Sequence, residues 1–274
     1  MTTTNIKLKE TFTGNYVPFE VIHFPAGELC VKLEDPTLTN YFYTIEWNYK
    51  SDLDLSIIEH LVDVVTTYLT NKDIWLHVPY LPNSRMDRRS IEGGSFGLSL
   101  FAKRINSLEF GLVSTVDAHS EVHIIDNLQN ASQKDCLASF LRGTDIDLSK
   151  YIIISPDKGA QKKIIPIVEY FKPVEFLKGG KTRNPDTGKI TNFTLEHTSL
   201  LVNPDTPIIV IDDICDGGGT FIGIAKEIRK QFPHNKLTLY TTHGIYSQGM
   251  YKLLNFYDNV FCYNKFTKDY HEQH

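Results

Sequence analysis

Residues 207–229, PIIVIDDICDGGGTFIGIAKEIR, decide the fold of the chain around them. The apolar run from Ile208 to Ile211 predicts a buried strand, and the apolar spacing from Thr220 to Gln231 predicts a helix. Two acids and a glycine-rich turn lie between these elements. A strand that passes through a tight turn into a helix indicates an α/β protein.

The turn in this stretch has the residue types that bind a phosphorylated sugar. Glycines let the backbone approach an anion, the helix N-terminus presents N–H groups, and Thr220 adds a hydroxyl donor. Asp212 and Asp213 can accept hydrogen bonds from ribose hydroxyl groups. A glycine pattern alone is equally typical of an acidic turn without a ligand, but two acids directly before the glycines favour the sugar phosphate.

Strands and helices alternate on both sides of this stretch. In the second half we expect strands at 151–154, 174–177 and 237–241, a helix near 161–171, a mobile polar loop at 178–189, and a last helix and strand between 246 and 261. In the first half we expect strands at 17–24, 29–33, 41–47, 74–78 and 112–116, and helices at 52–69, 95–105 and 133–141. The pattern predicts an α/β fold with helices flanking mostly parallel sheets.

The length of the chain indicates two domains. It has 274 residues, which is near the size at which a single hydrophobic core stops growing. The two halves have similar layouts, so we place the boundary near Thr144, giving domains 1–144 and 145–274. Since no Pro-, Gly- or Ser-rich linker separates them, we expect a tight cleft between the domains.

Composition narrows the classes of partner. With 28 basic and 33 acidic residues the net charge is −5, so we expect neither nucleic acid nor a membrane surface as a partner. The N-terminus has no targeting pattern and no apolar run reaches the length of a membrane span. The four scattered cysteines fit a reducing compartment, so we expect a cytoplasmic protein.

The acidic and glycine-rich segment resembles the phosphoribosyl diphosphate motif of type I phosphoribosyltransferases and ribose-phosphate diphosphokinases. The matching residues are Asp212, Asp213, Asp216, Gly217, Gly218, Gly219 and Thr220, and Gly217 replaces a threonine of the motif. The resemblance implies two phosphoribosyltransferase-like domains. It also implies that this segment binds ribose 5-phosphate.

Further segments resemble the diphosphokinases in particular. Residues 78–91, VPYLPNSRMDRRSI, match a nucleotide loop in which Arg85 and Asp87 would contact ATP, with Met86 in place of a glutamine. Phe24 to Glu28 match another ATP loop, in which Ala26 replaces an aspartate and which a neighbouring subunit supplies. The resemblance therefore implies that Phe24 and Glu28 bind ATP and that the protein is a homo-oligomer.

The remaining matches concern the metal and the chemistry. His119, in STVDAHSEVHIIDNL, and Asp157, in IISPDKGAQKKI, occupy positions that bind Mg²⁺ in the family, and His119 also lies at the ATP site. Lys181 and Arg183 match the K-x-R pair of the family's flexible catalytic loop. Positive charge at that place would stabilise the transferring diphosphoryl group.

The matching segments follow one another in the family's order from Phe24 to Thr220. They imply transfer of the β,γ-diphosphoryl group of ATP to the 1-hydroxyl of ribose 5-phosphate, with Mg²⁺ as cofactor. Two alternatives are a salvage phosphoribosyltransferase, which would not need the Arg85 loop, and a catalytically silent regulatory subunit, against which Lys181 and Arg183 argue.

Overall fold

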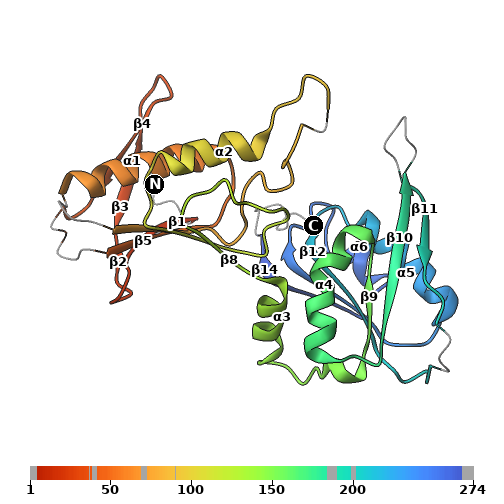
Figure 1. The fold of residues 1–274 in the computed structure, drawn as a ribbon. Coiled ribbons are helices and arrows are strands. Elements are labelled where there is room, and N and C mark those ends of the chain that lie inside the picture. The colour runs from red at the N-terminus through yellow and green to blue at the C-terminus, as the bar shows by residue number, and fades with distance from the viewer. Residues whose placement is uncertain are drawn as a thin grey trace. The chain divides into compact units, whose positions relative to one another are not determined.

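The computed structural model describes residues 5–36, 38, 42–68, 73–89, 91–183, 190–198 and 202–266. The chain forms two compact units, Met1–Ala131 and Ser132–His274, and each contains its own six-stranded sheet (Figure 1). Helix α3 (Gln133–Leu141), which a boundary near Thr144 assigns to the first domain, contacts α4 (Lys158–Phe171), β13 (Leu237–Gly244) and β14 (Asn259–Lys265). This helix therefore packs with the second unit.

The sheet of the first unit has the strand order β2-β1-β5-β6-β7-β8. Its strands are β1 (Ile6–Glu10), β2 (Tyr16–Val17), β5 (Phe42–Trp47), β6 (Asp73–His77), β7 (Leu112–Val116) and β8 (Leu128–Ala131). β1 is antiparallel to both of its neighbours, whereas β5 to β8 are parallel. A separate hairpin joins β3 (Phe19–His23) to β4 (Leu29–Leu33).

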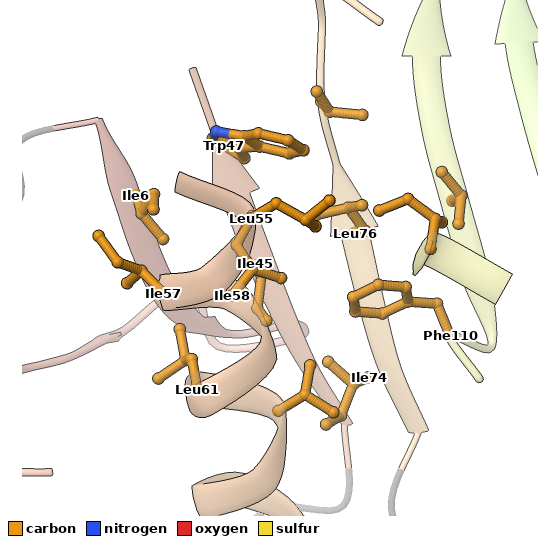
Figure 2. Packing of buried hydrophobic residues seen from close by; sticks show 14 of the residues in the cluster. Ile6, Ile45, Trp47, Leu55, Ile57, Ile58, Leu61, Ile74, Leu76 and Phe110 are labelled. Atoms are coloured by element: carbon orange, nitrogen blue, oxygen red, sulfur yellow. The ribbon is translucent and has the colours of Figure 1, made fainter. Parts of the chain in front are cut away.

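Helices α1 (Leu53–Tyr68) and α2 (Gly97–Asn106) pack on the apolar face of this sheet. Alternate residues of β5, namely Tyr43, Ile45 and Trp47, are buried in the core that these helices share with the sheet, as the strand period requires. Figure 2 shows Ile45 and Trp47 beside Leu55 and Ile58 of α1. Asp54, in the first turn of α1, accepts a hydrogen bond from the backbone N–H of Ser51, as the acid of a capping box does.

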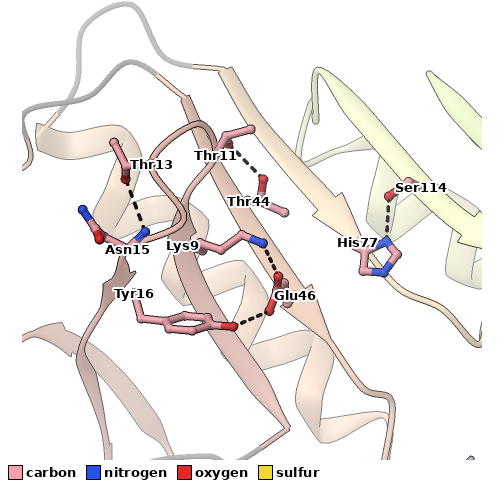
Figure 3. Close-up of polar contacts among 9 residues, drawn as sticks. All are labelled: Lys9, Thr11, Thr13, Asn15, Tyr16, Thr44, Glu46, His77 and Ser114. Carbon is pink, nitrogen blue, oxygen red and sulfur yellow. Dashed lines mark hydrogen bonds and ion pairs between the residues drawn. The ribbon is translucent and has the colours of Figure 1, made fainter.

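On the other face of this sheet, several of the intervening residues carry polar side chains (Figure 3). Lys9 forms an ion pair with Glu46, and His77 Nδ1 lies 2.9 Å from the Ser114 hydroxyl. Burial raises the pKa of Glu46, but the hydrogen bond and charge of Lys9 outweigh it and lower that pKa. Burial lowers the pKa of His77 below its ordinary value. Both shifts make the folded first unit favour the deprotonated forms.

These pKa shifts predict that the first unit loses stability in acid. The unfolded chain takes up a proton at His77 near its ordinary pKa of about 6.5, while the folded unit resists it until a lower pH. We expect the free energy of unfolding to fall as the pH drops below about 6.5, and His77→Gln to flatten this fall. Both tryptophans, Trp47 and Trp75, lie in the first unit, so their fluorescence during urea unfolding measures it separately. His60→Gln, at an exposed position of α1, is the control, and an equal fall in both variants would contradict the prediction.

The sheet of the second unit has the order β11-β10-β9-β12-β13-β14. Its other strands are β9 (Ile152–Ser155), β10 (Glu175–Arg183), β11 (Ile190–Leu195) and β12 (Ile208–Cys215), and its other helices are α5 (Gly219–Gln231), α6 (Tyr251–Leu254) and the 3₁₀ turn η1 (Leu148–Lys150). The neighbouring strands in the order β10-β9-β12-β13-β14 are parallel to one another. The edge strand β11 is antiparallel to β10. The predicted α/β fold class with mostly parallel sheets is confirmed.

The expected loop at 178–189 needs a correction. Residues Lys178 to Arg183 belong to β10. Lys178 pairs with β9, and β11 pairs with Gly179 to Arg183, which gives this polar segment backbone hydrogen-bond partners that its periodicity does not reveal. Lys181 is paired in register with Phe193. The rest of the expected loop, 184–189, lies outside the described residues.

The two faces of the second sheet have separate cores. Ile208 and Val210 pack with α5, whereas Ile209 and Ile211 pack with α4. Within the described ranges, no helix has the length and apolar character needed to cross a membrane.

Candidate functional site

The acidic pair lies at the carboxyl end of β12, where side chains alternate between the two faces of the sheet. Because Ile211 faces α4 and Val210 faces α5, Asp213 continues the α4 face and Asp212 the α5 face. The two acids assigned by sequence to one sugar therefore leave the strand on opposite faces.

Asp213 is anchored by a lysine of α4. Lys163 Nζ lies 2.8 Å from Asp213 Oδ2, and Asp213 is only 5% exposed. The backbone N–H of Asp213 in turn donates to Asp212 Oδ1 at 2.9 Å. The end of β12 is thus held both by an ion pair and by a local hydrogen bond.

Asp212 lies in an environment that disfavours its charge. Burial first, and then the neighbouring charge of Asp213, raise the pKa of Asp212 well above its ordinary value, and Asp157 adds to the effect. A bound cation would favour the charged form of this carboxyl group, and so would hydroxyl groups that donate hydrogen bonds to it.

The turn after β12 exposes the start of helix α5. Gly218 has φ +78°, a conformation that favours glycine, and it is the N-cap of α5 without any side-chain cap. A Cβ at Gly219 would meet nothing within 4 Å, and Thr220 is half-buried in the first turn. Asp216 accepts a hydrogen bond from the Ser247 hydroxyl at 2.5 Å, so its carboxylate helps to hold the turn. Uncapped N–H groups beside glycines suit an anionic ligand.

Asp157 and Lys181 are brought together by the parallel pairing of β9 and β10. Asp157 is the N-cap of α4, where its Oδ1 accepts from the backbone N–H groups of Gly159 and Ala160 at 2.8 and 3.2 Å. Its Oδ2 forms an ion pair with Lys181. Arg183 is the last residue of β10.

Two segments of the first unit that we expect to contact ATP lie side by side. Arg85 is exposed and Asp87 half-buried in the chain between β6 and α2, and exposed His119 follows β7. The Ser120 hydroxyl donates to the backbone oxygen of Ser84 at 2.8 Å, which joins the segment of His119 to that of Arg85.

The third segment that we expect to contact ATP is the turn between β3 and β4. The N–H of Phe24 donates to the Glu28 carbonyl at 2.8 Å, and the N–H of Gly27 donates to the Phe24 carbonyl at 2.9 Å. Phe24 is 49% exposed and Glu28 is exposed, so both side chains are accessible to a ligand or to another subunit.

The expected Mg²⁺ residues do not form a complete metal site by themselves. His119 belongs to the first unit and Asp157 to the second, and the described side chains include no group of three or more potential metal ligands. Mg²⁺ retains waters and binds substrate phosphates, so the one carboxylate of Asp157 fits it as a single protein ligand. Lys181 already balances the charge of that carboxylate, so a cation there would have to share it.

Sequence reasoning missed Lys163. It lies on the same face of α4 as Ala160, Ile164 and Ile167, which pack on the sheet. A lysine on the apolar face of an amphipathic helix was the available signal, because such a side chain requires a buried partner.

Comparisons with known proteins find similar proteins over most of the chain. No family model matches the chain. A ribose-phosphate pyrophosphokinase of Sulfurisphaera tokodaii is 24% identical over 236 residues, covering 85% of this chain and 78% of that protein. One of Ureaplasma parvum is 25% identical over 244 residues, covering 85% and 69%.

A solved structure has a similar fold over both units. The crystal structure of phosphoribosylpyrophosphate synthetase from Mycobacterium smegmatis matches with a TM-score of 0.64 at 17% identity, over 85% of this chain and 74% of that one. The fold thus defines the chain as a two-unit α/β protein of the kind found in that synthetase. The predicted resemblance to the ribose-phosphate diphosphokinases, also called pyrophosphokinases, is confirmed.

Proposed function

We propose that this protein is a ribose-phosphate diphosphokinase, which forms phosphoribosyl diphosphate and AMP from ATP and ribose 5-phosphate. The observation that carries the proposal is the similarity to ribose-phosphate pyrophosphokinases, because it extends over 85% of the chain and so includes both units. The ion pair between Lys181 and Asp157 supports the proposal independently. It lies near the end of β12, because the charge of Asp157 contributes to the raised pKa of Asp212.

The second unit binds ribose 5-phosphate in this proposal. The N–H groups of Gly217 to Thr220 hold the 5-phosphate at the uncapped start of α5, and Asp216 keeps their turn in place. Asp212 accepts hydrogen bonds from the ribose hydroxyl groups, with Asp213 next to it.

The first unit binds ATP. Arg85 has a planar cation that can stack on a base or contact phosphate, and Asp87 and His119 lie on the same pair of segments. Phe24 packs on the adenine and Glu28 accepts from its amino group, both from the exposed turn between β3 and β4.

Lys181 and Arg183 act on the transferring group. The ribose 1-hydroxyl attacks the β-phosphorus of ATP, the bond from that phosphorus to the α-phosphate oxygen breaks, and AMP leaves. Lys181 exchanges its partner Asp157 for the phosphoryl oxygens on which charge accumulates. Asp157 and His119 would hold Mg²⁺, which offsets the phosphate charge when bound.

One assay tests this function. The purified protein is incubated with Mg-ATP and ribose 5-phosphate, and phosphoribosyl diphosphate and AMP are measured together, with and without EDTA. We expect both products in equal amounts, loss of both with EDTA, and recovery with Mg²⁺. Nucleobase-dependent use of phosphoribosyl diphosphate without AMP release would instead indicate a salvage phosphoribosyltransferase. Binding of both substrates without turnover would indicate a regulatory subunit.

We further propose a cytoplasmic homo-oligomer in which the turn from Phe24 to Glu28 completes the ATP site of a neighbouring copy. The exposure of both end residues of this turn supports the idea. Light scattering at assay concentrations is expected to report at least a dimer. A fully active monomer would contradict the shared site.

A further inference from the structure

We propose that Lys163 is a positioning residue for ribose 5-phosphate, because its ion pair with Asp213 ties helix α4 to the end of β12 from which the phosphate-binding turn starts. The inference rests on the proposed function and adds to it a residue and a division of labour between the two adjacent acids.

The pair is largely withdrawn from water. The side chain of Lys163 is 26% exposed and that of Asp213 is 8% exposed, and the two residues are 50 positions apart in the chain. Around them, Ala160 and Ile164 of α4 pack with Ile211 of β12. In such surroundings, loss of Lys163 takes a charge partner away from a carboxylate that is largely shielded from water, and this weakens the hold on the end of β12.

The position of the pair gives it influence over the turn. Asp213 lies close before Asp216 in the sequence, and the backbone N–H of Asp213 donates a hydrogen bond to Asp212 Oδ1. On the other side, Lys163 belongs to the helix whose N-cap is Asp157, the partner of Lys181. One ion pair therefore fixes the helix that carries Asp157 against the strand that carries Asp212.

The same geometry separates the tasks of Asp212 and Asp213. Asp213 is 5% exposed and its Oδ2 is bound to Lys163, so it acts as an anchor. Asp212 forms no ion pair with any lysine or arginine of the described ranges and is half-buried, which leaves its carboxyl group for the ribose hydroxyls. An acid that is already anchored keeps its neighbour in one orientation before the sugar arrives.

The test compares the binding of two ligands to the full-length protein by isothermal titration calorimetry. Lys163→Met is expected to weaken ribose 5-phosphate binding at least about tenfold, because the anchor of the strand end is lost. The affinity for Mg-ATP, which we assign to the first unit, is expected to stay within about twofold of the wild-type value. Lys163→Arg, which keeps the cation, is expected to restore most of the ribose 5-phosphate affinity.

Lys162→Met is the matched control. This substitution removes the same charge from the preceding residue of the same helix, at an exposed position. The variant is expected to bind both ligands like the wild type. Wild-type ribose 5-phosphate affinity in folded Lys163→Met overturns the inference and leaves the proposed function standing. An equal loss for both ligands, which indicates general damage, also overturns it.

A second variant keeps the test decisive if Lys163→Met does not fold. The double variant Lys163→Met/Asp213→Asn removes both charges of the pair, so neither charge stays in the protein without the other. It is expected to unfold near the wild-type temperature yet still bind ribose 5-phosphate at least about tenfold more weakly. Normal binding by the double variant overturns the inference, whereas a wild-type protein that binds no ribose 5-phosphate overturns the proposed function and the inference together.

Discussion

Lys181→Ala is expected to lower kcat about 100-fold or more, because it removes a positioned cation from the transition state. In the structure Lys181 is held by its ion pair with Asp157, the second residue of the proposed reaction site. A lysine that is fixed before the reaction does not have to be ordered during it, which is why its loss affects turnover more than binding. Arg183→Ala is expected to cause a loss of the same order.

The same strand supplies the control for this prediction. Lys178 is exposed, and because it is three residues from Lys181 its side chain leaves β10 on the opposite face. Lys178→Ala removes the same charge from the same element and is expected to keep wild-type kcat. Steady-state kinetics with both substrates measures the effect, and thermal unfolding checks the fold. Near-normal turnover in both Lys181→Ala and Arg183→Ala would remove them from the catalytic site.

Gly218→Val is expected to weaken ribose 5-phosphate binding about 100-fold, with little effect on ATP. Gly218 has φ +78°, which costs an L-residue about 1–2 kcal/mol. An added Cβ would also lie 3.1 Å from Leu253 Cδ2. The turn would then have to shift, and its N–H groups would no longer point at the phosphate. Thr220→Ala removes a single hydroxyl donor, worth about 0.5–1.5 kcal/mol, and is expected to lose at most about tenfold.

Gly14→Val separates backbone strain from ligand binding. Gly14 has nearly the same φ, +79°, and lies in the first unit, where an added Cβ meets nothing within 4 Å. This variant is expected to bind ribose 5-phosphate normally in calorimetric titrations. If Gly218→Val instead weakened ATP and left ribose 5-phosphate unchanged, the assignment of the two ligands to the two units would be reversed.

Local patterns were enough to predict most elements of the two units. The apolar spacing after Ser51 predicts a helix, and the structure forms α1 from Leu53 to Tyr68 with Asp54 bound to the Ser51 N–H. The run from Ile208 to Ile211 predicts a strand, and the structure extends it as β12 to Cys215. These predictions succeed because the period of buried residues along a segment must match its own geometry.

Three features depended on pairing between segments that sequence periodicity does not show. Gly179 to Arg183 continue strand β10 because β11 pairs with them. Ser120 joins the segments of His119 and Arg85 by a bond across 36 residues.

The third feature is the set of partners at the end of β12. The sequence alone determined that acids, glycines and a threonine follow one another from the end of β12 through the turn into the start of α5, and so which chemistry this segment can offer. Only the tertiary structure decided that Asp213 is bound by Lys163 and Asp157 by Lys181. The physical reason is that parallel strands and their helices come together through long crossovers, so the neighbours of a side chain are set by packing of the whole unit and not by its own segment.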